Sequence, residues 1–199
     1  MKTAHVFSIA LVIALCSCSN KQVKPIPVDI NFKISQIVPF KDVTKSIRDS
    51  LQKTGVLLGS YDEPEIGYLA IGDSLKFHIG VINERIMLTR TSKSIDDSNS
   101  LLAILAVEPT SIIDNSFIKK AAANDKEVLI TFNEKGAKKW ADYTKNSIGK
   151  EVAFLLDNKV CFWTRIEGEI SDGTAKITGL KSTEEAQILA YKLMKNLTL

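Results

Sequence analysis

Residues 127–179 constrain the fold more than any other part of the chain, because strand-like and helix-like patterns alternate there without a long loop between them. The apolar and β-branched run 128–132 predicts a strand. Asn133 then predicts the start of a helix, since its side-chain oxygen can accept hydrogen bonds from the free amides of the first turn. Gly149 predicts where the helix stops. Residues at helical spacing predict its packing face: Ala137, Trp140, Ala141 and Thr144.

Two strands joined by a tight turn are predicted after this helix. Residues 152–156 are apolar at every position, which predicts a central strand covered on both faces. The pair Asp157 and Asn158 favours a turn. Because side chains alternate along a strand, we expect Val160, Phe162, Thr164 and Ile166 to face the core. The residues expected on the opposite face are Lys159, Cys161, Trp163 and Arg165.

A series of residues in fixed order then carries a family resemblance. Its members are Phe132, Glu134, Gly136, Ala137, Trp140, Ala141, Thr144, Gly149, Lys150, Leu156, Asp157, Val160, Ile170, Gly173, Ala175, Ile177, Thr178, Gly179, Glu185 and Ala186. This series resembles the head subdomain of the first periplasmic domain of SecD/SecDF, a membrane-embedded accessory of the protein-export channel. The resemblance covers residues 101–197. It implies a ferredoxin-like arrangement for residues 101–199, with structural turns at Gly136, Gly149, Gly173 and Gly179.

The sequence departs from the family pattern at two places. Phe162, Trp163 and Thr164 stand where the family commonly has Ser-Ala-Pro, and Asp172 replaces the first glycine of a Gly-Gly pair. Tryptophan and arginine are enriched at binding hot spots. We therefore expect a partner-binding surface at Trp163, Arg165 and Glu167; the alternative is that Trp163 packs as core.

The N-terminus has the pattern of a targeting signal. Lys2 precedes a short apolar run at residues 6–15, and the sequence then reads Leu-Cys-Ser-Cys, which resembles a bacterial lipobox. We expect a signal peptide at residues 1–17, lipidation of Cys18 and a tether at 18–29; the alternative is an ordinary secretory signal. The residues after Cys18 favour the outer membrane, facing the periplasm. With Cys16 removed and Cys18 acylated, Cys161 would have no partner for an intrachain disulfide.

The rest of the chain predicts a β-rich region at residues 30–100 in front of the head-like region at 101–199. The patterns favour strands at 31–38, 56–58, 66–71, 75–82, 85–91 and 101–107, and a helix at 41–53. In 75–82, Leu75, Phe77, Ile79 and Val81 alternate with polar residues and predict one buried face. Residues 109–124 predict a turn and a helix carrying Ile113, Phe117, Ile118 and Ala121. Ser182 and Glu185 form a capping-box pattern before a last helix, whose predicted stripe is Ala186, Leu189, Ala190 and Leu193.

Composition argues against catalysis and nucleic-acid binding. His5 falls in the signal and leaves His78 as the only other histidine, so a triad or histidine-metal cluster is disfavoured, and no cofactor is expected. The net charge is only +3 with both signs mixed, which predicts no nucleic-acid surface.

We expect an α+β protein with helices on one face of a mostly antiparallel sheet. No membrane-spanning run follows the head-like region in this sequence, so we also expect a stand-alone, non-enzymatic lipoprotein. Its partners would be the membrane, through Cys18, and exported polypeptides or envelope proteins. The alternatives are an envelope lipoprotein that uses the same scaffold for an unrelated partner in envelope assembly, and a hydrolase with an unrecognised site.

Overall fold

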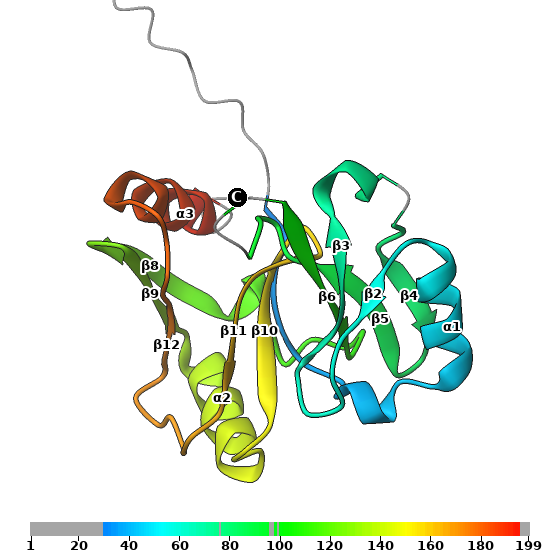
Figure 1. The fold of residues 1–199 in the computed structure, drawn as a ribbon. Helices are drawn as coiled ribbons and strands as arrows, with labels where there is room; N and C mark the ends of the chain where they lie inside the picture. The colour runs from blue at the N-terminus through cyan, green and yellow to red at the C-terminus, as the bar shows by residue number, and fades with distance from the viewer. Residues whose placement is uncertain (1–29, 76, 96–97, 99, 196–199) are drawn as a thin grey trace, which may run out of the picture.

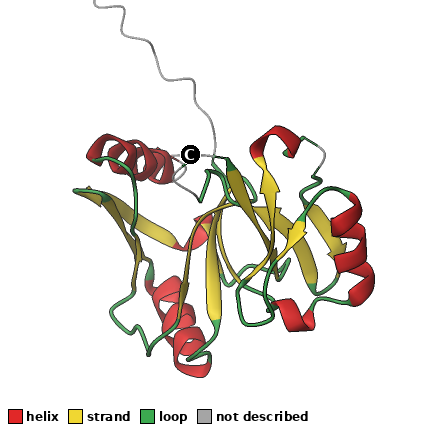
Figure 2. Cartoon of the chain, viewed as in Figure 1, coloured by secondary structure: helices red, strands yellow, loops and turns green. Residues whose placement is uncertain are grey.

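The protein is an α+β fold, as expected, with antiparallel sheets and three helices among the described residues (Figure 2). The computed structural model describes residues 30–75, 77–95, 98 and 100–195. The expected signal peptide, Cys18 and tether lie outside this part of the chain. The elements up to β6 are β1 Phe32–Gln36, η1 Phe40–Asp42, α1 Lys45–Lys53, β2 Leu57–Leu58, β3 Glu65–Ala70, η2 Ile71–Asp73, β4 Gly80–Asn83, β5 Ile86–Arg90 and β6 Leu101–Val107. The later elements are β7 Ile113–Asp114, η3 Asn115–Phe117, β8 Ile118–Asn124, β9 Glu127–Phe132, α2 Glu134–Asn146, β10 Glu151–Leu156, β11 Lys159–Arg165, β12 Thr174–Ile177 and α3 Thr183–Lys195.

The described strands form three sheets rather than one. Their strand orders are β2-β3-β6-β5-β4, β11-β10-β1-β7 and β12-β9-β8. Helix α1 packs on the five-stranded sheet, whereas α2 and α3 pack around the three-stranded sheet on the other side of the molecule (Figure 1). The four-stranded sheet lies between these two parts. It is the element that joins them.

Strand β10 is the central, doubly covered strand that its sequence predicts. Val152 and Phe154 point into the larger core, which also contains the buried residues of α2 and α3. Ala153 and Leu155 point the other way, into a second core shared with β5 and β6. All four side chains are buried. The apolar residue at every position of 152–156 therefore reflects burial on both faces.

Strand pairing interlocks the two predicted regions, 30–100 and 101–199. Strand β1 comes from the first region, yet it pairs with β10 along its whole length. Strand β6 comes from the second region, yet it pairs with β3 and β5 of the five-stranded sheet. Each region thus contributes one strand to a sheet of the other.

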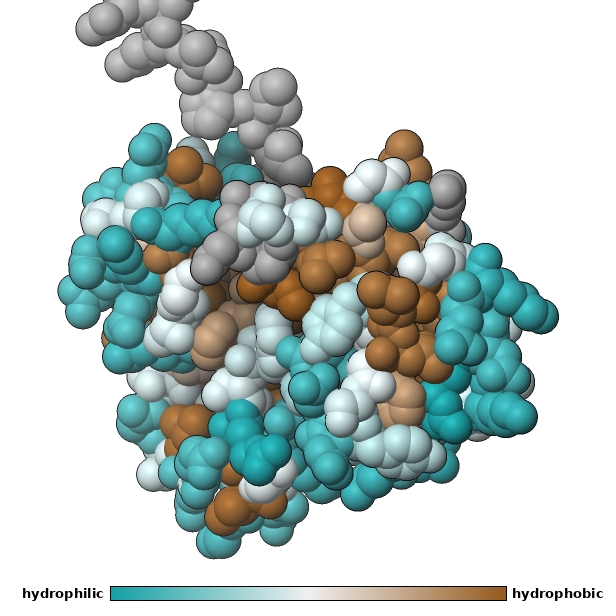
Figure 3. All heavy atoms as spheres, in the orientation of Figure 1, coloured by the Kyte–Doolittle hydropathy of each residue, from teal (hydrophilic) through white to brown (hydrophobic). Residues whose placement is uncertain are grey.

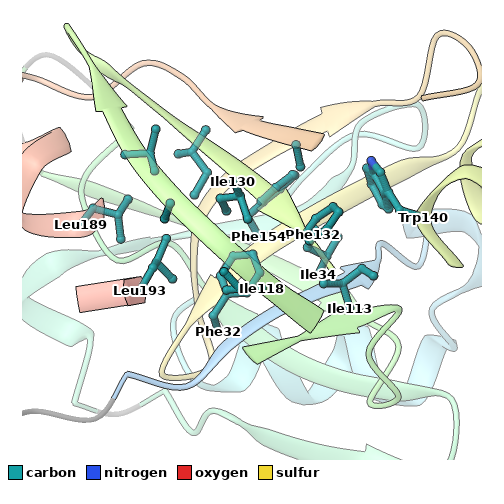
Figure 4. Close-up of a cluster of buried hydrophobic side chains, with 14 of the residues drawn as sticks. Phe32, Ile34, Ile113, Ile118, Ile130, Phe132, Trp140, Phe154, Leu189 and Leu193 are labelled. Carbon is teal, nitrogen blue, oxygen red and sulfur yellow. The ribbon is translucent and has the colours of Figure 1, made fainter. Parts of the chain in front are cut away.

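Helix α2 and its start are as predicted. The Asn133 side chain accepts a hydrogen bond of 2.9 Å from the amide of Gly136. Trp140 is buried and lies edge-on to Phe132, with ring centroids 6.2 Å apart (Figure 4). Gly149, at φ +82°, follows the end of the helix. Gly136 lies inside the first turn of the helix, so the expectation of a structural turn at Gly136 is corrected; a Cβ there would lie 2.7 Å from the Cβ of Phe117.

Helix α3 also begins where the capping pattern places it. The Ser182 hydroxyl accepts a hydrogen bond of 3.1 Å from the amide of Glu185. The Glu185 side chain reaches back to the amide of Lys181 instead of the amide of Ser182. The predicted stripe is confirmed, because its four residues are buried against the three-stranded sheet: Ala186, Leu189, Ala190 and Leu193.

The helix predicted within residues 109–124 is wrong, because this segment forms β7, η3 and the edge strand β8. Strand β8 contains an irregularity at Lys119: Ile118 pairs with Phe132, and Lys120 pairs with Thr131. The extra residue places Ile118 and Ala121, three positions apart, in the same core. A bulged strand thus mimics helical spacing.

The strand predicted at 75–82 begins only at Gly80. Leu75 is 97% exposed, and Val81 is exposed as well, so the predicted buried face is reduced to Phe77 and the half-buried Ile79. Among the described strands, β4 lies at the edge of its sheet. The alternating pattern was therefore a poor guide to burial in this segment.

Candidate functional site

A cavity of about 280 Å³ lies where β11, the segment after β5 and helix α3 meet. We call it the β11 cavity. Strand β11 contributes Val160, Cys161 and Trp163 to its wall. The opposite wall comes from α3 and the residues just before it, including Leu180 and Ile188. Figure 3 shows hydrophobic surface in the middle of this face, where the two parts of the molecule meet.

A bulge in β11 determines which side chains reach the cavity. Phe162 pairs with Phe154 and Val160 pairs with Leu155, so Cys161 is an extra residue without a cross-strand partner. From Cys161 on, the bulge therefore places each side chain on the opposite face of the strand from the one that regular alternation predicts. Val160 and Trp163 therefore pack on the core shared with β5 and β6.

The prediction of which β11 side chains share a face is therefore wrong in part. Phe162 packs on the larger core, 5.4 Å from the ring of Phe154, on the opposite face from Val160. Cys161 packs on the same side as Phe162. Thr164, which the alternation placed in the core, is exposed, whereas Ile166 is buried as expected.

The three residues expected to form a partner surface do not meet in one cavity. Trp163 is half-buried, packs against the same core as Tyr68 and lines the β11 cavity. Arg165 is exposed, pairs with Glu151 at 3.3 Å and lines a separate, polar cavity. Glu167 is exposed beyond the end of β11. Of the three, only Trp163 belongs to the β11 cavity.

Charged side chains lie around the apolar wall. Lys93, from the segment after β5, forms an ion pair with Glu185 in the first turn of α3. Burial and then the charge of Lys181 lower the pKa of Lys93, whereas the ion pair with Glu185 favours its charged form. Lys181 and Lys192 also line the cavity. Sequence patterns missed these lysines, since they lie far from Trp163 in the chain and only the fold brings them together.

The environment of the Cys161 thiol makes it a poor nucleophile. It donates a hydrogen bond of 3.3 Å to the Phe154 carbonyl oxygen. Burial raises the pKa of Cys161 to about 12, so the thiolate is scarce at neutral pH. The cavity thus offers apolar contact and positive charge rather than a nucleophile.

The edge of the four-stranded sheet runs along the cavity. Strand β11 is the outer strand of that sheet. Among the described residues of the segment after β5, Thr91 and Ser92 pair with the beginning of β11, through a parallel bridge between Thr91 and Val160 and a 2.8 Å hydrogen bond from the Ser92 amide to the Val160 carbonyl. An edge strand can pair with an added extended segment. The arrangement is suited to binding a polypeptide.

Metal-binding and membrane-spanning features are absent from the described part of the chain. Residues 30–75, 77–95, 98 and 100–195 contain no group of three histidine, cysteine or acidic side chains placed to hold a metal ion. None of the helices in these residues has the length and apolar character needed to cross a bilayer.

Comparison with known proteins identifies the family. Residues 84–196, more than half of the chain, match the family model "SecDF, P1 head subdomain". The chain belongs to this family. The match begins within the turn before β5, so the SecDF head in this protein includes β5 as well as everything from β6 to α3.

Several protein translocase subunits SecD are similar to this SecDF head. The subunit of Acidaminococcus fermentans is 47% identical over 66 residues, which is 33% of this chain and 16% of that protein. That of Rhodothermus marinus is 37% identical over 76 residues, or 38% of this chain and 12% of that protein. That of Rickettsia bellii is 29% identical over 168 residues, or 76% of this chain and 33% of that protein. The chain therefore spans a third or less of each of these relatives.

A solved structure is similar as well. The crystal structure of SecDF in its super-membrane-facing form matches 84% of this chain and 19% of that protein, at 20% identity and a TM-score of 0.48.

Proposed function

We propose that this SecDF head is a non-enzymatic, protein-binding module that holds polypeptide segments in the β11 cavity and assists protein export or the handling of exported chains. It would be attached to the cell envelope through a lipid on Cys18, at the periplasmic face of the outer membrane. In this proposal the cavity captures a segment of a chain and performs no chemistry on it.

Family membership supports the connection to export. The similar proteins are named as protein translocase subunits. This chain resembles only a part of them, so a role in export is transferred here as a proposal.

The observation that carries the proposal is the position of Trp163. It is a large aromatic side chain, half-buried on an edge strand and lining an apolar cavity. Tryptophan gives much contact area for little loss of side-chain entropy when it binds. The edge strand β11, to which Trp163 belongs, also supplies main-chain hydrogen-bonding groups. Any extended segment can pair with these groups, whatever its sequence.

Site-specific photocrosslinking in cells would test this. Ile95 and Ile188 line the cavity and are 41% and 49% exposed, so a photoreactive residue fits at either position without opening the core. Ile148, 60% exposed beyond the end of α2 and outside the cavity, is the matched control. We expect crosslinks to exported chains or to the export channel from Ile95 and Ile188 only. Equal crosslinking from Ile148 would contradict the assignment of the site.

The same experiment separates the alternative partner. If crosslinks from the cavity lead only to envelope-assembly proteins, the scaffold serves a partner unrelated to export. The role in export would then be wrong, while the binding site would stand.

A further inference from the structure

The described part of the chain begins in the wall of the β11 cavity. Ile30, its first residue, lines the cavity and is 7% exposed. Two hydrogen bonds fix the backbone there. The Asn115 side-chain amide donates to the Ile30 carbonyl oxygen at 3.1 Å, and the Asn31 amide donates to the Asp157 side chain at 2.9 Å. The residues that precede Ile30 in the chain are therefore attached at the cavity itself.

The sequence directly before Ile30 favours an extended backbone. Residues 24–30 read Lys-Pro-Ile-Pro-Val-Asp-Ile. Each proline fixes its own φ at about −65° and disfavours the helical region for the residue before it. A segment restricted in this way has less conformational freedom to lose when it binds in an extended form.

Apolar side chains alternate along this segment in step with Ile30. Ile26 and Val28 precede Ile30 at every second position, so in an extended chain the three side chains share one face. Pro25 and Pro27 occupy the other positions. Since amides also alternate between the two edges of a strand, the missing proline N–H groups fall on one edge only. The other edge keeps the donors of Ile26 and Val28.

The cavity offers the apolar space that such side chains need. Trp163, Leu180 and Ile188 contribute to its wall. Its volume of about 280 Å³ lies just below the range for small-molecule sites, roughly 300–1,000 Å³. This volume suits one or two aliphatic side chains and is too small for a folded partner. Val28 is separated from Ile30 by only about 7 Å of extended chain, so it can reach this space.

We propose that residues 26–29 of the chain's own tether occupy the β11 cavity when no other polypeptide is bound, and so regulate access to it. Val28 packs against Trp163 and Ile188, and an incoming segment displaces it. The inference rests on the proposed function, because it concerns the same cavity. It adds a competitor that is built into the chain.

The tether competes from a high effective concentration. A segment joined covalently to the cavity wall reaches roughly millimolar effective concentration, so even a weak contact fills the cavity in many molecules. The apparent affinity for an added polypeptide is reduced to the fraction of molecules whose cavity is open. If about 10–30% of the cavities are open, binding is weakened about three- to tenfold.

Disulfide trapping in the processed, full-length protein tests where the tether lies. Val28→Cys and Ile188→Cys are combined with Cys161→Ala, which removes the thiol in the cavity wall. Ile188 is 49% exposed on α3. The control carries Ile148→Cys instead of Ile188→Cys, since Ile148 is 60% exposed beyond α2 and outside the cavity. We expect an intramolecular disulfide with Ile188→Cys and little with Ile148→Cys, because Cα atoms more than about 7 Å apart cannot be bridged.

Peptide binding measures the regulation. The probe is a fluorescein-labelled peptide with a central Leu-Phe-Leu. Val28→Ser should tighten its binding about three- to tenfold, since the cavity is then open in nearly all molecules. Val23→Ser makes the same change in the tether, but Val23 is farther from Ile30 and falls on the opposite face of an extended chain. We expect that variant to bind as the unaltered protein does.

The outcomes separate the inference from the proposed function. Equal disulfide formation in the two pairs, or equal peptide binding by Val28→Ser and Val23→Ser, would overturn the inference and leave the peptide-binding function in place. A disulfide formed only between two molecules would place the tether in the cavity of a second copy and would overturn it as well. Failure of every variant to bind the peptide, with a selective intramolecular disulfide, would overturn the proposed function while the position of the tether would stand.

Discussion

Gly173 lies directly against Ala137, where the chain turns into β12 beside helix α2. A Cβ added to Gly173 would lie 2.8 Å from the Cβ of Ala137, closer than real Cβ atoms approach. The residue has φ +71°, a backbone conformation that glycine adopts without strain. Its carbonyl oxygen accepts a hydrogen bond of 2.9 Å from the Phe132 amide. Position 173 therefore requires glycine for two separate reasons.

Alanine at position 173 should destabilise the protein more than alanine at position 179. Gly179 has a similar φ of +73° but no atom within 4 Å of an added Cβ. At either position, alanine would have to adopt a positive φ, and this strain lowers the free energy of unfolding by about 1–2 kcal/mol. Only Gly173→Ala adds a close contact, and overpacking costs a further ~1–3 kcal/mol. Urea unfolding measures both values; equal losses would show that α2 moves aside freely.

Valine at position 173 should lower the melting temperature further. A β-branched side chain is more strained than alanine at positive φ, and it is also larger beside Ala137. Thermal unfolding checks this. An unchanged melting temperature would mean that the turn into β12 adapts to the side chain.

The regular elements could be predicted because periodicity reports burial directly. Trp140 and Thr144 fall on the buried face of α2, and residues 152–156 of β10 are all apolar because cores lie on both sides. Bulges break that relation. Lys119 in β8 and Cys161 in β11 are extra residues, and each changes which later side chains face the core. A single sequence gives no local signal for such an insertion.

The candidate site could be predicted only in part, because some of its residues are brought together only by the fold. Trp163 could be predicted because it departs from the family pattern and lies two residues from an arginine. Lys93 and Lys192 could not be found, since their contribution depends on strand order and on the position of α3. Arg165 lies only two residues from Trp163 in sequence, yet it lines another cavity together with Glu151.

Cys161 should react slowly with alkylating reagents in the folded protein. Burial raises its pKa from 9.0 to about 12. At pH 8 the folded protein then has roughly a hundred to a thousand times less thiolate than the unfolded chain. Iodoacetamide labelling, followed by mass spectrometry of the peptide containing Cys161, measures the rate with and without urea. Similar rates in both states would contradict this environment for the thiol.

The same pKa shift predicts a loss of stability at alkaline pH. The folded state keeps the thiol protonated above pH 9, while the unfolded chain releases the proton. The stabilisation is therefore complete below pH 9 and falls as the pH rises from 9 to about 12. Cys161→Ala should show a shallower decline in the free energy of unfolding over that range. An identical decline in the variant would assign the alkaline loss to other groups.

Lipidation should depend on Cys18 and not on Cys16. Cys18→Ser should abolish incorporation of a fatty-acid analogue and leave the protein soluble or unprocessed, because no thiol remains at the cleavage position. Cys16→Ser keeps the acceptor and should be labelled normally. Persistent labelling of the Cys18 variant would show that the N-terminus is not a lipoprotein signal.

Trp163→Ala should weaken peptide binding with a smaller loss of stability than Trp140→Ala. Trp140 is 2% exposed in the larger core, and truncating such a residue typically costs about 3–5 kcal/mol. Trp163 is half-buried and has one side open to the β11 cavity. Its truncation removes fewer packing contacts and should therefore cost less, while the cavity loses its largest apolar surface. Urea unfolding and peptide titration on the two variants give the comparison. A stability loss at Trp163 as large as that at Trp140, with peptide binding retained, would make Trp163 a core residue and leave the binding surface elsewhere.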